Sequence, residues 1–180
     1  MTGAAVSYGG SLYELAVEES LGRQILDELD GVCGLFKEIP EYMKLLSEPS
    51  IPKRERCALI DEVFGGRVHT YVANFLKILC ENGILRELSG CLGEYRRRYY
   101  EANGILTATA VSAAPMTPEQ ADRLREKLTA MTGHPVELTT KTDPLCIGGV
   151  RLDIDGKRLD GTVRERLDAM RALLMGSGNA

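Results

Sequence analysis

The stretch from residue 143 to residue 167 constrains the fold most, because four local signals follow one another in it without a gap. Asp143-Pro144 predicts a turn, since proline fixes its own φ and favours an extended conformation in the preceding residue. Apolar and charged residues then alternate up to Ile154, which is typical of a half-buried strand. Asp155-Gly156 predicts a two-residue hairpin turn. Thr162, with an acidic residue three positions later, predicts the capped start of a C-terminal helix.

The character of the sequence changes at Gly104, where we predict a boundary between two domains. Residues 1–104 carry apolar side chains at helical spacing almost throughout, and prolines and glycines divide them into about six segments. Connections as short as these make neighbouring helices run antiparallel. The sequence therefore predicts an N-terminal six-helix bundle over residues 1–104.

Residues 105–180 predict a small α+β domain. The segment from Ile105 to Ala113 is rich in residues that favour strands. Thr117 and Gln120 form a capping-box pattern that begins a helix, and Gly133 ends it. Alternation over residues 136–141 predicts a second strand. With the closing hairpin and helix, the predicted order is strand, helix, strand, hairpin, helix.

The charge and hydropathy patterns exclude several classes of protein. Residues 1–104 carry the whole net charge of −4 and residues 105–180 are neutral, so neither domain offers a basic surface to nucleic acid or to an anionic membrane. No apolar run approaches the ~18 residues that a membrane span needs. The N-terminus lacks the pattern of a signal peptide. We therefore expect a bacterial cytoplasmic protein.

The sequence predicts no metal, cofactor or catalytic site. His69 and His134 are its two histidines, and its five cysteines contain no C-x-x-C spacing, so we expect small buried thiols rather than ligands or nucleophiles. The segment from Asp153 to Gly156 is a poor calcium loop, because its glycine comes too early and its twelfth position is an arginine. Gly148-Gly149 precedes a strand rather than a helix, which favours a bulge or a close backbone approach over a phosphate loop.

One basic and aromatic cluster leaves two interpretations open. Arg96 to Arg98 stand among Tyr95, Tyr99 and Tyr100. Such a cluster could neutralise phosphates and stack on bases, which would make the chain an RNA-associated α+β binding protein. The alternative is structural, with tyrosines on the apolar face of a helix and arginines near its C-terminus, where the helix dipole favours cations.

Taken in order, several segments resemble the delta subunit of F-type ATP synthase, which in mitochondria is the oligomycin-sensitivity-conferring protein. The closing segment contributes Asp143-Pro144, Ile147-Gly148-Gly149 and Asp160-Gly161-Thr162. Earlier matches are Tyr8, Leu12 and Ala16, then Asn74-Phe75-Leu76, Glu81-Asn82-Gly83, and Val111 to Met116. Gly9 and Gly10 replace alanines or similar residues expected from the family, so we expect a weakened first helical turn.

This resemblance implies a non-catalytic stator subunit without cofactors, present in one copy and monomeric when isolated. It implies that residues 1–104 bind the N-terminal helices of alpha subunits of the catalytic head. Residues 105–180 would bind the b subunits of the peripheral stalk. The resemblance places the protein at the cytoplasmic face of a bacterial membrane, which it reaches only through the complex.

The resemblance also implies a groove between the first and fifth helices that accepts an amphipathic helix. The candidate contacts are Tyr8, Leu12, Ala16, Phe75 and Leu79. The alternative is that these five side chains fill the core of the bundle.

Overall fold

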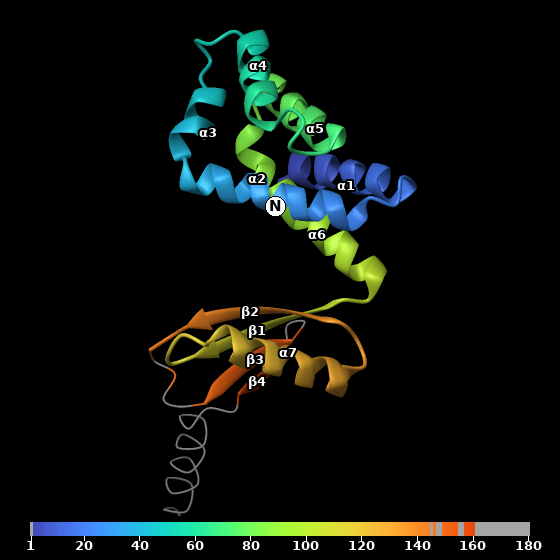
Figure 1. The fold of residues 1–180 in the computed structure, drawn as a ribbon, viewed down its shortest axis with the longest axis vertical. Helices are drawn as coiled ribbons and strands as arrows, with labels where there is room; N and C mark the ends of the chain where they lie inside the picture. Colours follow the sequence, from blue (N-terminus) through green and yellow to red (C-terminus); the bar gives the residue numbers. More distant parts are fainter. Residues whose placement is uncertain (1, 145, 147–148, 155–156, 161–180) are drawn as a thin grey trace, which may run out of the picture. The chain divides into compact units, whose positions relative to one another are not determined.

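The computed structural model describes residues 2–144, 146, 149–154 and 157–160. The chain divides between Tyr100 and Glu101 into two compact units, which we call the helical unit and the α+β unit. The helical unit contains, in order, α1 (Gly3–Glu18), α2 (Gly22–Glu38), α3 (Pro40–Leu46), α4 (Lys53–Phe64), α5 (Thr70–Glu81), a 3-10 turn η1 (Leu85–Glu87) and α6 (Leu88–Asn103), whose last residues belong to the second unit. Figure 1 shows these helices.

Prolines and glycines set the helix boundaries much as the sequence predicts. Pro40 opens α3, where its missing N–H costs no hydrogen bond. Gly65 follows the last residue of α4. Gly83 and Gly104, which follow α5 and α6, have φ of 68° and 61°. Because side chains disfavour these left-handed conformations, glycine is the residue that ends a helix there at least cost.

α1 begins earlier in the chain than we expect from the sequence, which predicts a first helical turn weakened by Gly9 and Gly10. The helix begins at Gly3, and the hydroxyl of Thr2 caps it by accepting a hydrogen bond from the backbone N–H of Ala5 at 3.3 Å. Gly9 and Gly10 therefore lie in the middle of α1, where both are buried, and do not weaken a first turn. The expectation was wrong because it placed the helix start too late in the chain.

The core of the helical unit consists of large apolar side chains from all six helices and η1. The most completely covered members include Ile25, Leu46, Ile60, Leu76, Leu79, Leu85 and Leu88. Tyr95 is also fully buried, and its hydroxyl donates to the backbone oxygen of Gly22 at 3.0 Å. Its ring meets that of Tyr13 edge to face, with centroids 5.4 Å apart.

In its described residues the α+β unit has a four-stranded sheet with one helix packed against it (Figure 1). Its elements are β1 (Leu106–Ser112), α7 (Pro118–Thr132), β2 (Val136–Thr142), β3 (Val150–Ile154) and β4 (Lys157–Asp160), and the strand order is β2-β1-β3-β4. α7 connects β1 to β2 in the chain, and these two strands pair in parallel. The β1–β3 and β3–β4 pairs are antiparallel. Leu128 of α7 packs on Ala108 and Val136 of the sheet.

The predicted capping box is confirmed. Thr117 Oγ1 accepts from the backbone N–H of Gln120 at 3.3 Å, and Gln120 Oε1 accepts from the backbone N–H of Thr117 at 2.9 Å. Gly133 ends α7 in the left-handed conformation. Residues that the sequence identifies therefore supply hydrogen-bond partners for two otherwise unpaired N–H groups at the start of α7. The glycine that ends this helix is likewise identified by the sequence.

The closing segment is described in part. The backbone N–H of Cys146 donates to the oxygen of Asp143 at 3.0 Å, which closes a turn around Pro144. Ile154 pairs with Lys157, which confirms a two-residue hairpin connection, and Asp160 pairs with Arg151. Gly149 has φ of 81°, a conformation that favours glycine. Gly148, Asp155, Gly156, Thr162 and the predicted C-terminal helix lie outside the described residues.

Candidate functional site

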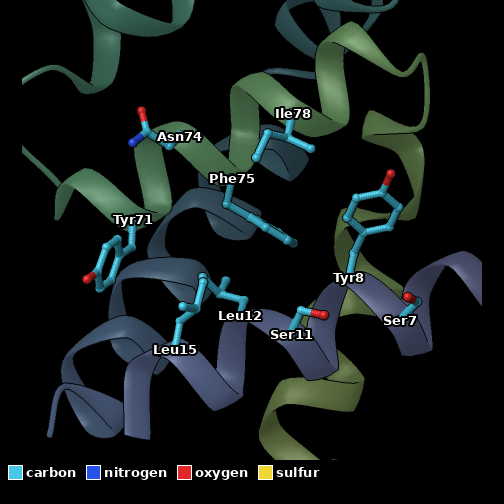
Figure 2. A pocket seen from close by; sticks show the side chains of 9 residues that line it. All are labelled: Ser7, Tyr8, Ser11, Leu12, Leu15, Tyr71, Asn74, Phe75 and Ile78. Atoms are coloured by element: carbon cyan, nitrogen blue, oxygen red, sulfur yellow. The ribbon is translucent and has the colours of Figure 1, made fainter. Parts of the chain in front are cut away.

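A groove of about 410 Å³ lies between α1 and α5. Figure 2 shows it with Tyr8 and Tyr71 at opposite ends and with Leu12 and Phe75 facing each other between them. Its lining is Ser7, Tyr8, Ser11, Leu12, Leu15, Tyr71, Asn74, Phe75 and Ile78. None of these nine side chains is charged, so the groove suits an apolar ligand surface.

The two walls of the groove follow the same spacing. α1 contributes Tyr8, Ser11, Leu12 and Leu15, and α5 contributes Tyr71, Asn74, Phe75 and Ile78. Both sets fall at positions i, i+3, i+4 and i+7, which places each set along one face of its helix. The groove therefore runs along both helices as a strip rather than as a closed hole.

The groove has buried and exposed apolar residues. Leu12 and Phe75 are only 3% and 6% exposed, whereas Leu15 and Ile78 are 47% and 44% exposed. The exposed pair leaves apolar surface in water in this chain. A partner that covered Leu15 and Ile78 would gain about 25 cal/mol for each Å² of apolar surface removed from water.

The structure separates the five candidate contacts into two groups. Tyr8, Leu12 and Phe75 line the groove. Ala16 and Leu79 lie one helical turn beyond Leu12 and Phe75, do not line the groove, and are 0% exposed. These two side chains belong to the core of the helical unit, which is the alternative role that the sequence leaves open for them.

Sequence reasoning missed six lining residues, among them Leu15, Tyr71 and Ile78. The signal for them is that α5 is apolar on more than one face. Val72 and Leu76 are fully buried in the core, and Tyr71 and Ile78 continue the apolar character on the groove side. A helix that is apolar beyond its core stripe has a second surface to cover.

His69 fixes the start of α5 and hence the position of Tyr71. Its Nδ1 accepts from the backbone N–H of Tyr71 at 3.2 Å, and its own backbone N–H donates to Glu28 Oε2 at 2.6 Å. The rings of His69 and Tyr71 lie edge to face with centroids 4.9 Å apart. The histidine therefore acts as the N-cap of a groove-forming helix.

α1 is positioned by an unusually close approach to α6. A Cβ at Gly9 would lie inside contact distance of the backbone oxygen of Cys91, and a Cβ at Gly10 would lie 2.6 Å from the guanidinium of Arg98. Both glycines are buried. Since no side chain separates the two helices there, α1 approaches α6 closely while its groove face remains uncovered.

The arginine and tyrosine cluster is engaged within the helical unit. Arg97 and Arg98 each donate to Glu94, whose side chain is 1% exposed, with nitrogen to oxygen distances of 2.7 to 3.0 Å. These hydrogen bonds lower the pKa of the Glu94 carboxyl to about 2. Arg98 also donates to Glu14 of α1 at 2.9 Å, and Arg96 pairs with Asp30 of α2. These contacts pair all three arginines with acidic side chains of the helical unit.

Most of the cysteine side chains are buried, as the sequence predicts. All five cysteines are free, and four of them are buried while Cys57 is half-buried. Burial raises the pKa of the Cys33 and Cys91 thiols to about 11. Among the described residues, no three or more His, Cys, Asp or Glu side chains gather in a way that could hold a metal ion. In this same part of the chain every helix is too short or too polar to traverse a lipid bilayer.

Fold and groove together define a protein of two compact units, one helical with an apolar surface groove and one α+β. The family model of the ATP synthase delta (OSCP) subunit matches residues 4–174, so the chain belongs to that family. The ATP synthase subunit delta of Alkaliphilus oremlandii is 30% identical over 167 residues, covering 93% of each chain. That of Erythrobacter litoralis is 30% identical over 170 residues, covering 94% of this chain and 92% of its own.

The fold agrees with a solved relative. A chain in the cryo-EM structure of the Toxoplasma gondii mitochondrial ATP synthase hexamer superposes with a TM-score of 0.74. The superposition covers 97% of this chain and 98% of the other at 16% sequence identity. The two chains therefore share a fold at low sequence identity.

Proposed function

We propose that this protein is the non-catalytic stator subunit of a proton-translocating F-type ATP synthase. In this proposal the six helices of the helical unit act as one bundle, and their groove holds the N-terminal helix of an alpha subunit. The α+β unit holds the b subunits of the peripheral stalk. The protein then works at the cytoplasmic face of a bacterial membrane and resists rotor torque on the catalytic head.

The apolar groove between α1 and α5 is the observation that carries the proposal. An amphipathic helix presents apolar side chains at i, i+3, i+4 and i+7, and both walls of the groove have that same spacing. The exposed Leu15 and Ile78 supply apolar surface that such a helix would cover. Ser7, Ser11 and Asn74 supply uncharged hydrogen-bonding groups.

Stator duty requires a long-lived attachment. A Kd on the order of 1 nM with an association rate of about 10⁶ M⁻¹s⁻¹ corresponds to a bound lifetime of roughly 10³ s. Micromolar affinity at the same association rate would last about a second. A groove of about 410 Å³ is a small contact, so we expect it to be one of several simultaneous attachments.

Calorimetric titration of the full chain with a peptide of the cognate alpha subunit's N-terminal ~20 residues, about 30 Å of helix, tests the groove. We expect saturable one-to-one binding. Leu15→Asp and Ile78→Asp should each weaken it about tenfold or more, because each places a carboxylate against apolar partner surface. Both side chains are exposed, so the fold should persist, whereas charges at the buried Leu12 or Phe75 would disturb the core.

Val17 provides the matched control. It is an apolar residue of α1 that is 52% exposed and lies outside the groove lining. Val17→Asp should bind the peptide as the unmodified chain does. Absence of binding by the folded chain, or equal losses in Val17→Asp and Leu15→Asp, would remove the groove from the proposal.

A further inference from the structure

Cys57 of α4 and Cys80 of α5 face each other across two packed helices (Figure 1). Cys57 Sγ donates to Glu81 Oε1 at 3.6 Å, and Glu81 follows Cys80 in the chain. The two thiols are also in hydrogen-bonding contact with each other. One helical turn away, Lys77 Nζ of α5 and Asp61 Oδ1 of α4 pair at 2.5 Å. The ion pair and the thiol pair therefore fit the same antiparallel register of α4 and α5.

The two thiols differ in their access to solvent. Cys57 is half-buried, whereas the other four cysteines are buried, and Cys80 is 0% exposed. Cys57 thus departs from the expectation of small buried thiols. A small dissolved oxidant reaches Cys57 first, and Cys80 is the neighbouring thiol that can react with the oxidised sulfur.

We propose that Cys57 and Cys80 are an oxidisable pair, which forms a disulfide between α4 and α5 when the chain meets a peroxide. Hydrogen peroxide transfers one oxygen atom to the Cys57 thiolate, which becomes a sulfenic acid, and hydroxide leaves. The Cys80 thiolate then attacks the Cys57 sulfur, so that the S–S bond forms and the S–O bond breaks. Overall, two thiols and one peroxide give one disulfide and two molecules of water.

The surroundings of the pair tolerate the loss of both thiol protons. Cys80 Sγ donates to the backbone oxygen of Leu46 at 3.4 Å, and Arg56 Nη1 donates to the same oxygen at 3.0 Å. When the disulfide forms, the Arg56 donor stays on this oxygen, which is therefore not left unpaired. Glu81 is exposed, so water replaces the Cys57 donor there.

The thiol chemistry sets the conditions under which the disulfide forms. Burial raises the pKa of the Cys57 and Cys80 thiols, which keeps the thiolate fraction small at neutral pH. Oxidation is therefore slow and needs sustained exposure to peroxide. Small-molecule thiols reverse it. While it lasts, the disulfide ties α5, which forms one wall of the groove, to α4.

Peptide mapping of the full chain tests the pair. The reduced chain is exposed to excess hydrogen peroxide, its remaining thiols are blocked with N-ethylmaleimide in denaturant, and it is digested with trypsin without reduction. Because trypsin cuts after lysine and arginine, we expect residues 57–67 and 78–86 to be recovered as two peptides joined by a disulfide. Treatment with dithiothreitol before the digestion should separate them.

Calorimetry of the oxidised chain supplies a second readout. The disulfide closes the loop over residues 57–80 and so restricts the unfolded chain. We expect the unfolding midpoint of the helical unit to rise by about 5 °C or more, and dithiothreitol to reverse the rise. Cys57→Ser should abolish both the linked peptides and this shift.

Cys33 and Cys91 are the matched control. They belong to α2 and α6 and are 5% and 1% exposed, so we expect both to stay reduced. Cys33→Ala should therefore keep the linked peptides and the shift. Three results would overturn the proposal: both thiols of the pair still free after exposure, Cys57 oxidised to a sulfinic acid beside a reduced Cys80, or either residue joined to a different cysteine.

Discussion

At Gly9 the absence of one carbon atom determines how α1 meets α6. The position lies in the interior of a helix, where alanine is normally preferred to glycine by up to ~1 kcal/mol. A Cβ there would lie inside contact distance of the backbone oxygen of Cys91. Because backbone atoms cannot move aside as a side chain can, α1 would have to shift. This contact between residues 82 positions apart outweighs the local propensity.

We expect Gly9→Ala to lower the free energy of unfolding by about 1–3 kcal/mol, the usual cost of overpacking. Gly31→Ala in α2 is the control, because a Cβ at Gly31 has no neighbouring atom within 4 Å. That substitution should be neutral or stabilising by up to ~1 kcal/mol. Urea denaturation of both variants measures the difference. Equal effects at the two positions would contradict the close approach.

Glu94 is a buried carboxylate of the helical unit whose ionised form is held by hydrogen bonds. Its folded pKa is lowered to about 2 from an ordinary value of 4.5, by the hydrogen bonds from Arg97 and Arg98. The ionised carboxylate therefore stabilises the fold above pH 4.5, and this contribution is lost as the pH falls toward 2.

We expect Glu94→Gln to cost about 1.5–3 kcal/mol at pH 7, because hydrogen bonds to a charged group are lost. At pH 3 the cost should be smaller, since the unmodified chain has itself lost part of the contribution. Glu14→Gln is the control, because Glu14 is 69% exposed and pairs with the same Arg98. It should cost less than about 1 kcal/mol. Urea denaturation at both pH values decides between these outcomes.

At the scale of elements, the sequence predicts what is local and misses what depends on distant packing. Helix ends at Gly65, Gly83 and Gly104 and the cap at Thr117 follow from residues close to them in the chain. The role of Gly9 in the middle of α1 does not, because the deciding contact is with Cys91 of α6. Helices and strands that depend on neighbouring residues could therefore be predicted, whereas contacts between elements distant in the chain could not.

The groove, too, could be predicted from the sequence only in part. The apolar spacing of α1 and α5 is visible in the sequence, and it identifies the two helices as candidates. Choosing between Phe75 on the groove face and Leu79 in the core requires knowing which neighbours cover α5. Leu15 and Ile78 could not be predicted as groove residues, because the exposure of an apolar side chain depends on the folded surface.

At the scale of the whole molecule, the two units have cores built from different residues. Leu76, Leu79 and Tyr95 are buried in the helical unit. Ala108, Leu128 and Val136 form the core of the α+β unit. Because each of these sets of core residues belongs to one unit, we expect each unit to fold as a cooperative body.

We therefore expect differential scanning calorimetry of the full chain to show two unfolding transitions. Gly9→Ala should lower the midpoint of one transition only. Thr117→Ala removes the cap of α7, at a cost of about 0.5–2 kcal/mol, and should lower the midpoint of the other. Because the two sites lie in different units, the double variant should show both shifts unchanged. A single transition that both substitutions lower equally would mean that the two units unfold as one.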